Sequence, residues 1–219
     1  MELHSPLKYT KRGNKTYWVS VNQVFGENPD VYKKWGISGH NGIDFGLGCK
    51  SYEVSSVSYG ASIVAVHDGT VVRTVWDEPM STKGNGVYVE YRESDTIYWF
   101  CYWHLSEIKV KVGDKVKTGQ VVGNMGNSGN CMPMPSELYP YNGTHLHFGL
   151  YKWTVVDGKW IPDNTDFGGA IDPMPLFSAE TILFKFNEYY EANSLGRMAI
   201  VLYPLIWLIE KIRENFKKI

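Results

Sequence analysis

The sequence is organised around the stretch Gly39-His40-Asn41-Gly42-Ile43-Asp44-Phe45, in which a histidine and an aspartate stand four residues apart. Glycines in and just after this stretch argue against a helix, because each costs ~1 kcal/mol relative to alanine in a helix interior. A turn at Asn41-Gly42 that runs into a short strand fits better. In that geometry His40 and Asp44 can converge on one point and bind a metal ion such as zinc, but two ligands do not make a site.

Residues 144–150 form a second histidine-bearing stretch, in which polar and apolar residues alternate with the period of a β-strand. His145 and His147 therefore point to one face, while Leu146 and Phe148 point to the other and anchor the strand in a core. His147 can complete a set of two histidines and one aspartate, which leaves a fourth position for water. That arrangement is typical of a catalytic zinc site rather than a closed structural one.

Several further motifs lie between and around these two stretches, in the order Tyr102-Trp103-His104-Leu105-Ser106, Gly113-Asp114-x-Val116-x-x-Gly119-Gln120, Gly126-Asn127-Ser128-Gly129 and Ile171-Asp172-Pro173. Together with His40-x-x-x-Asp44 and His145-x-His147, this series resembles the M23 (lysostaphin/LytM-like) zinc endopeptidases, which cut peptide cross-links in bacterial cell walls. The resemblance covers roughly residues 17 to 177. It implies a mainly β fold, an antiparallel β-sheet LytM-type peptidase domain, and peptidoglycan peptides as the substrate.

The resemblance also implies a division of labour among the histidines. One zinc ion per chain is expected on His40, Asp44 and His147. His104 and His145 are implied to be the non-ligand pair that handles the attacking water and the developing oxyanion. We expect His145 to be the general base and His104 the oxyanion donor, although the two roles can be exchanged because either imidazole can do either job.

The composition indicates a folded chain of 219 residues, with 43% hydrophobic and 21% charged residues and a formal net charge of -1. That charge gives no general attraction to nucleic acid, and we expect no nucleic-acid partner. Three parts are expected: a polar leader at residues 1–15, the peptidase domain at residues 16–177 and a helical extension at residues 178–219. Predicted features of the domain are strands at 17–25, 62–66, 70–75, 86–91 and 96–103, short strands within 110–122, a turn at Asp68-Gly69 and irregular loops at 46–60 and 126–143. The second loop is interpreted as a cleft wall or a surface insertion.

The extension at residues 178–219 has helical spacing of its apolar residues, and its run at 198–209 is apolar apart from Pro204. That run is too short to span a bilayer, which takes ~20 residues. Peripheral membrane contact, docking on the β domain and self-association remain open as its use. The first residues lack the apolar core of a signal peptide. We therefore expect delivery to the bacterial cell wall by lysis, a phage particle or non-classical secretion.

The cysteines, Cys49, Cys101 and Cys131, are odd in number and widely spaced, so they indicate neither a disulfide framework nor a cysteine zinc site. Cys101 alternates with two tryptophans, and a buried thiol is expected there. Cys131 lies near the histidine strand and can approach the metal, but the ligand set is complete without it.

Two other classes of function share features with this sequence. The segments 68–71 and 113–120 also resemble biotinyl and lipoyl carrier domains, but Lys83 lacks the hairpin motif that a carrier needs. The stronger alternative is a non-catalytic cell-wall-binding or hydrolase-activating domain of the same fold. Such domains usually lack some metal ligands, whereas all the positions implied to act are present here, which favours an active enzyme.

Overall fold

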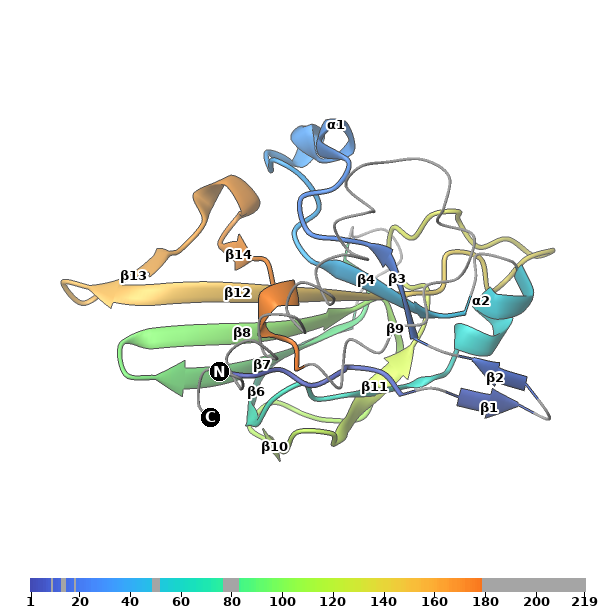
Figure 1. Ribbon diagram of the computed structural model, residues 1–219, viewed down its shortest axis with the longest axis horizontal. Helices are drawn as coiled ribbons and strands as arrows, with labels where there is room; N and C mark the ends of the chain where they lie inside the picture. The colour runs from blue at the N-terminus through green and yellow to red at the C-terminus, as the bar shows by residue number, and fades with distance from the viewer. Residues whose placement is uncertain (9, 13–14, 18, 49–51, 77–82, 179–219) are drawn as a thin grey trace, which may run out of the picture.

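The structure is a computed structural model that describes residues 1–8, 10–12, 15–17, 19–48, 52–76 and 83–178. Its largest element is a nine-stranded sheet, in which the strand order is β10-β6-β7-β8-β12-β4-β3 and β13 and β14 also pair with β12 (Figure 1). These strands are β3 (Val19–Gln23), β4 (Ile43–Leu47), β6 (Gly69–Val75), β7 (Gly86–Glu93), β8 (Thr96–Trp103), β10 (Lys115–Val116), β12 (Leu146–Val156), β13 (Lys159–Pro162) and β14 (Ala170–Ile171).

A three-stranded sheet, with the order β5-β11-β9, packs against one face of the large sheet, and β1 and β2 form a separate pair. The bounds are β1 (Thr10–Arg12), β2 (Lys15–Tyr17), β5 (Ser62–Val64), β9 (Leu105–Ile108) and β11 (Val121–Met125). Every strand pair is antiparallel, which confirms the predicted fold class. The helices are short: α1 (Pro29–Tyr32), α2 (Tyr52–Ser58) and the 3₁₀ turns η1 (Lys33–Trp35), η2 (Thr165–Phe167) and η3 (Met174–Leu176).

Strand alternation divides the buried residues between the two faces of the large sheet. On β8, Phe100 and Tyr102 point into the main core between the sheets, where β12 adds Phe148. Cys101 and Trp103 point to the opposite face and join a smaller aromatic cluster. The prediction that Cys101 is a buried thiol is therefore confirmed.

Around Asp68-Gly69 the chain passes from one sheet to the other, because β5 pairs with β11 while β6 pairs with β7 and β10. One local prediction was wrong. The segment 46–60 is not entirely a loop, since α2 occupies residues 52–58. Its glycines lie outside the helix, at 46, 48 and 60, so the stretch between them is free to be helical. Residues 126–143 contain no helix or strand, as predicted.

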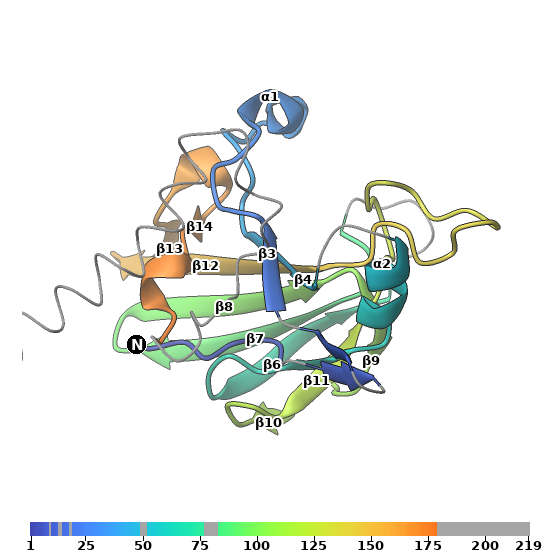
Figure 2. The ribbon, with the colours of Figure 1, turned by 45° about the vertical axis from the view of Figure 1, so that its right-hand side comes forward.

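The first residues of the chain belong to the packed domain. Leu3 and Leu7 lie in the main core, and Leu3 forms a bridge with Phe177. The ribbon shows the N-terminus beside the segment that follows η3 (Figure 2). The Ser178 N–H donates a hydrogen bond to the Leu3 carbonyl, so residues 3 and 178 lie side by side. The sequence shows few apolar residues here, but these two are placed where they are fully covered.

The predicted C-terminal extension lies, from residue 179 onward, outside the described residues. Within the described part of the chain, no helix combines the length and the apolar character needed to cross a membrane.

Tyr102→Phe should lower the free energy of unfolding by about 1–3 kcal/mol, the cost of leaving a buried polar group unpaired. Tyr102 is fully buried, and its hydroxyl oxygen accepts a hydrogen bond from the Val66 N–H at 2.9 Å. Denaturant unfolding measures the change. Tyr98→Phe, at a half-buried position of the same strand, is the control and should cost less because water can replace a lost partner. Equal losses in the two variants would contradict this account.

Candidate metal centre

The antiparallel register of three strands brings the candidate residues together. His147 on β12 lies directly opposite Asp44 on β4 and, on its other side, opposite Trp103 on β8. His40 precedes β4 in a tight segment whose backbone is bonded to the 26–27 turn, with the His40 N–H donating to the Glu27 carbonyl at 2.9 Å. A side chain at Gly39 would meet the Gly26 carbonyl oxygen at 2.5 Å, so glycine is required for this close approach.

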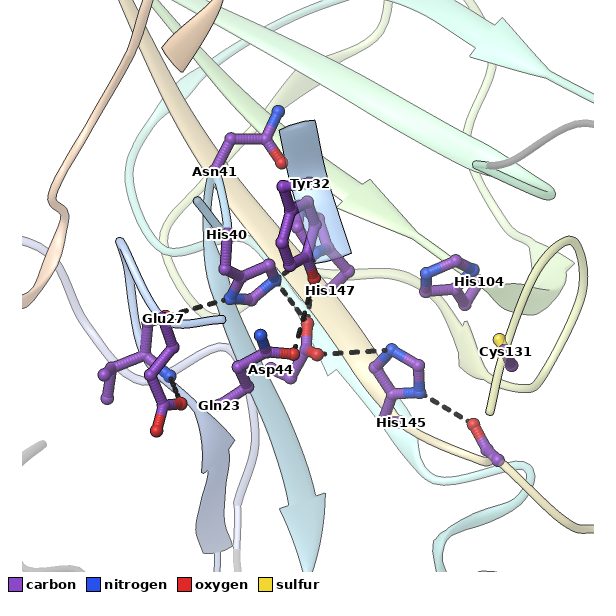
Figure 3. Close-up of polar contacts among 12 residues, drawn as sticks. Gln23, Glu27, Tyr32, His40, Asn41, Asp44, His104, Cys131, His145 and His147 are labelled. Atoms are coloured by element: carbon purple, nitrogen blue, oxygen red, sulfur yellow. Dashed lines mark hydrogen bonds and ion pairs between the residues drawn. The ribbon is translucent and has the colours of Figure 1, made fainter. Parts of the chain in front are cut away.

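His40, Asp44 and His147 present one ligand atom each to a common point (Figure 3). His40 Nε2 lies 2.9 Å from His147 Nδ1, and Asp44 Oδ1 lies 3.1 Å from the first and 3.0 Å from the second. Ligand atoms that bind a tetrahedral zinc ion at 2.0–2.1 Å are about 3.3 Å apart. The three atoms therefore fit three corners of such a site, and this cluster can hold a metal ion.

The electrostatics of the cluster suit a cation. Burial alone would raise the pKa of Asp44, but His40, His145 and His147 together hold it well below its usual range, so this carboxylate is ionised. Burial lowers the pKa of His147 to about 4, so its imidazole is neutral at pH 7. Burial also opposes the charged form of His40, although Asp44 raises the pKa of that ring above its ordinary value. The His40 Nδ1–H donates to the Val24 carbonyl at 3.1 Å, which turns the Nε2 lone pair of the neutral ring toward the other ligand atoms.

Two neighbouring residues restrict the position of the His147 ring. Trp103 stacks on it with a centroid separation of 4.7 Å and an interplanar angle of 6°. At the Nε2 edge of the ring, Gly42 is so close that an added Cβ would lie 2.7 Å from His147 Nε2 and 2.5 Å from the Phe148 carbonyl oxygen. The ring position therefore depends on glycine at residue 42.

Gly42→Ala should lower metal affinity roughly 10–100-fold, the range typical for loss of a group that orients a ligand. Dialysis against a graded chelator, followed by elemental analysis, measures this. The control is Gly69→Ala, where the added Cβ would meet Val89 Cγ1 at 2.6 Å, because Gly69 lies on β6, separated from β12 by two strands. The control should lose stability and keep its metal. Equal metal loss in both variants would show that the effect is global.

His104 follows β8 but does not continue its alternation of side chains. Alternation along β8 places it on the face of Tyr98, Phe100 and Tyr102, but its φ of 63° interrupts the strand between β8 and β9. Its ring instead lies 4.6 Å from the His145 ring and 6.1 Å from the His147 ring, beside the metal cluster. The left-handed conformation of His104 therefore turns its side chain away from the core aromatics.

His104 and His145 are both oriented by backbone carbonyls. The His104 Nδ1–H donates to the Ser128 carbonyl at 2.8 Å, and the His145 Nδ1–H donates to the Gly143 carbonyl at 2.7 Å. With Nδ1 as the donor, the Nε2 atom of each ring faces away from its carbonyl partner. His145 Nε2 lies 3.6 Å from Asp44 Oδ2, and burial with the neighbouring histidines lowers the pKa of His104 to about 3. Two proton-accepting nitrogens therefore stand next to the cluster.

A cavity of about 380 Å³ opens onto the cluster through Asp44 and His145. One side is formed by β3, β4 and α2, and the other by Met132, Pro133 and Gly143 of the 126–143 loop. The interpretation of that loop as a cleft wall is therefore confirmed. The lining is mostly small or polar, and Asp44 and Glu27 are its acidic side chains.

Residues 38–162 match peptidase family M23. The chain belongs to this family. Among curated M23 relatives, the glycyl-glycine endopeptidase ALE-1 of Staphylococcus capitis is 28% identical over 170 residues, which cover 74% of this chain and 38% of ALE-1. The peptidoglycan DD-endopeptidase ShyC of Vibrio cholerae is 33% identical over 196 residues, which cover 90% of this chain and 34% of ShyC.

The chain thus spans little more than a third of the length of these M23 relatives. Its fold is also found among solved structures. The SpoIIQ–SpoIIIAH pore-forming complex contains a chain with a TM-score of 0.50 and 24% identity, and the match covers 81% of this chain and 91% of that one. At this identity the likeness concerns the fold alone.

The structure brings together the four histidines and the aspartate that the sequence predicted for the site of this M23 chain, and their roles stay predictions. Sequence reasoning missed the residues that hold them: Trp103 against His147, Tyr32 with its ring 5.5 Å from that of His40, and the carbonyl groups of Val24, Ser128 and Gly143. The position of Trp103, immediately before His104 at a strand end, was the one available signal. Backbone carbonyls leave no such mark in a sequence.

Proposed function

We propose that this M23 chain is a zinc-dependent endopeptidase that hydrolyses peptide cross-links of bacterial peptidoglycan. The observation that carries the proposal is the convergence of three ligand atoms within 3.1 Å of one another, next to two imidazoles with outward lone pairs. The relatives ALE-1 and ShyC, whose names describe endopeptidases, support it. The proposed place of action is the bacterial cell wall.

In this proposal His40, Asp44 and His147 are the ligands. Two imidazole nitrogens and one carboxylate oxygen suit zinc and leave a fourth position open. A zinc ion held there supplies Lewis acidity and makes water a better nucleophile at neutral pH.

The other two histidines handle protons. We assign His145 Nε2 to accept the proton of the attacking water and to return it to the leaving amine. Asp44 Oδ2, at 3.6 Å, stabilises the imidazolium that forms in between. His104 is assigned to the developing oxyanion. Its Nδ1–H is engaged with Ser128, so donation from Nε2 requires a second proton on this ring, and exchange of the two roles stays open.

The cavity beside the cluster is the proposed substrate subsite. Its lining includes Gly46, Gly48 and Gly143, which leave room for the backbone of a substrate peptide. Glycine bridges and direct D-amino-acid cross-links both fit such a subsite, and the names of ALE-1 and ShyC describe different bonds.

Digestion of purified cell walls tests the function. The zinc-loaded chain is incubated with walls that have glycine bridges and with walls that have direct cross-links, and the fragments are weighed by mass spectrometry. New amino and carboxyl ends within a cross-link are expected from at least one wall type, and not with Asp44→Ala. Wall binding without any new ends would overturn the proposal and favour the non-catalytic wall-binding or hydrolase-activating domain.

A further inference from the structure

A second group of metal-binding side chains adjoins the first and shares none of its residues. His104, Cys131 and His145, here named the thiol cluster, offer one ligand atom each, and these atoms lie within 4.8 Å of one another. Figure 3 shows Cys131 beside His104, with His145 between Cys131 and Asp44. Cys131 is fully buried, His104 is nearly so, and the His145 side chain is 15% exposed.

Existing contacts already draw the members of the thiol cluster together. The Ser128 carbonyl accepts hydrogen bonds from both the His104 ring at 2.8 Å and the Cys131 thiol at 3.5 Å. Cys131 belongs to the 126–143 loop and packs against the far end of that loop, where a Cβ added at Gly143 would meet Cys131 Cβ at 2.9 Å. The thiol is therefore held at the histidine pair by packing on both sides.

One thiolate and two imidazoles are a softer ligand set than the nitrogen and oxygen atoms of the first cluster. Such sets select thiophilic ions such as zinc and cadmium. Ligand atoms around a four-coordinate ion of this kind are about 3.5 Å apart, so the thiol cluster must contract by about an ångström. Cys131 is on a loop rather than a strand, so it can make that movement without breaking sheet pairs.

We propose that the thiol cluster binds a second, inhibitory thiophilic divalent cation, with Zn²⁺ and Cd²⁺ as its representatives. On binding, the Cys131 S–H bond breaks, its proton passes to solvent and a bond from Sγ to the ion forms, with no change of oxidation state. The ion also takes a lone pair from His104 and one from His145. Both rings are then unavailable to the water and the oxyanion, so hydrolysis stops.

The second site is expected to be weaker than the first. Burial raises the pKa of the Cys131 thiol, so the ion has to displace a firmly held proton. The inhibitory half of the proposal rests on the proposed function, whereas the binding half does not. The ion that supports catalysis is therefore expected to load first and the inhibitory ion only at higher concentration.

Titration of the full chain, already loaded with one zinc per chain, tests the proposal. Cd²⁺ is added while the ultraviolet thiolate-to-cadmium absorption band, the metal content after desalting and peptide hydrolysis are followed. Hydrolysis is also measured against excess Zn²⁺. The variants are Cys131→Ser and Cys131→Ala, of which either suffices if the other fails to fold. Cys101→Ser and Cys49→Ser are the matched controls, since Cys101 is an equally buried thiol within the aromatic cluster.

The wild type and both controls are expected to show the band, a second equivalent of metal and inhibition. The Cys131 variants should lose the band and the second equivalent, and should need at least about tenfold more added metal for half-inhibition. No band in the wild type, or equal inhibition of the wild type and the Cys131 variants, overturns the proposal. A Cys131-dependent band in a chain that hydrolyses nothing would instead refute the proposed function and keep the metal site.

Discussion

An Asp44→Ala protein should lose its zinc and its peptidase activity together. Asp44 supplies the carboxylate oxygen of the proposed ligand set, within 3.1 Å of both histidine nitrogens. Its removal takes away a direct ligand and the negative charge that attracts the cation. The affinity should therefore fall by more than the roughly 10–100-fold that loss of an outer-shell partner costs. Elemental analysis and turnover on the same preparation measure both effects.

The matched control for Asp44→Ala is Asp68→Ala. Asp68 is also an aspartate with a lowered pKa, but it lies at the surface, bonded to Lys117 and Thr118. Its replacement should leave the zinc content and turnover unchanged. An Asp44→Ala protein that keeps its full zinc content would contradict the assignment of Asp44 as a ligand, whatever its activity.

His145→Ala should keep most of its zinc and lose about 10²–10⁴-fold in turnover, the usual value of general acid–base help. His104→Ala should behave in the same way. His147→Ala, only two residues from His145 on the same strand face, should lose both metal and activity. The two variants should differ because His147 Nδ1 lies among the three proposed ligand atoms, whereas His145 Nε2 faces Asp44 Oδ2, which is not one of them.

Combining His104→Ala with His145→Ala gives a further test of the same assignment. The double variant should lose less than the product of the two single effects, because the pair serves one transition state. Zinc content and turnover are measured on the same preparations. A metal-free His145→Ala protein beside a zinc-loaded His147→Ala protein would show that the two roles have been exchanged.

The sequence could predict the candidate ligands because Asp44 and His147 lie on strands and His40 stands only four residues before Asp44. Period-two alternation puts His145 and His147 on one strand face, and a strand after Asn41-Gly42 can pair with it, as β4 and β12 do. Spacing alone could not place His104. One residue with a positive φ interrupts the alternation of a strand, and histidine adopts that conformation too rarely for the sequence to predict it.

Other features that the sequence did not predict have a similar physical origin. Asp68-Gly69 carries a strong local turn signal, but the pairing of the strands on either side depends on distant strands. Here β5 pairs with β11 and β6 pairs with β10. Leu3 and Leu7 are isolated apolar residues in a polar segment, and only the packed domain shows where they are covered. Tertiary contacts thus decided the points that local pattern left undetermined.

X-ray absorption at the zinc edge, on protein with one zinc per chain, tests the central claim most directly. The account predicts a first shell of nitrogen and oxygen atoms at about 2.0–2.1 Å, with two imidazoles and no sulfur. The same spectrum should persist in Cys131→Ser. A sulfur scatterer at about 2.3 Å in the one-zinc protein would place the ion in the thiol cluster and contradict the assignment of His40, Asp44 and His147 as the metal centre.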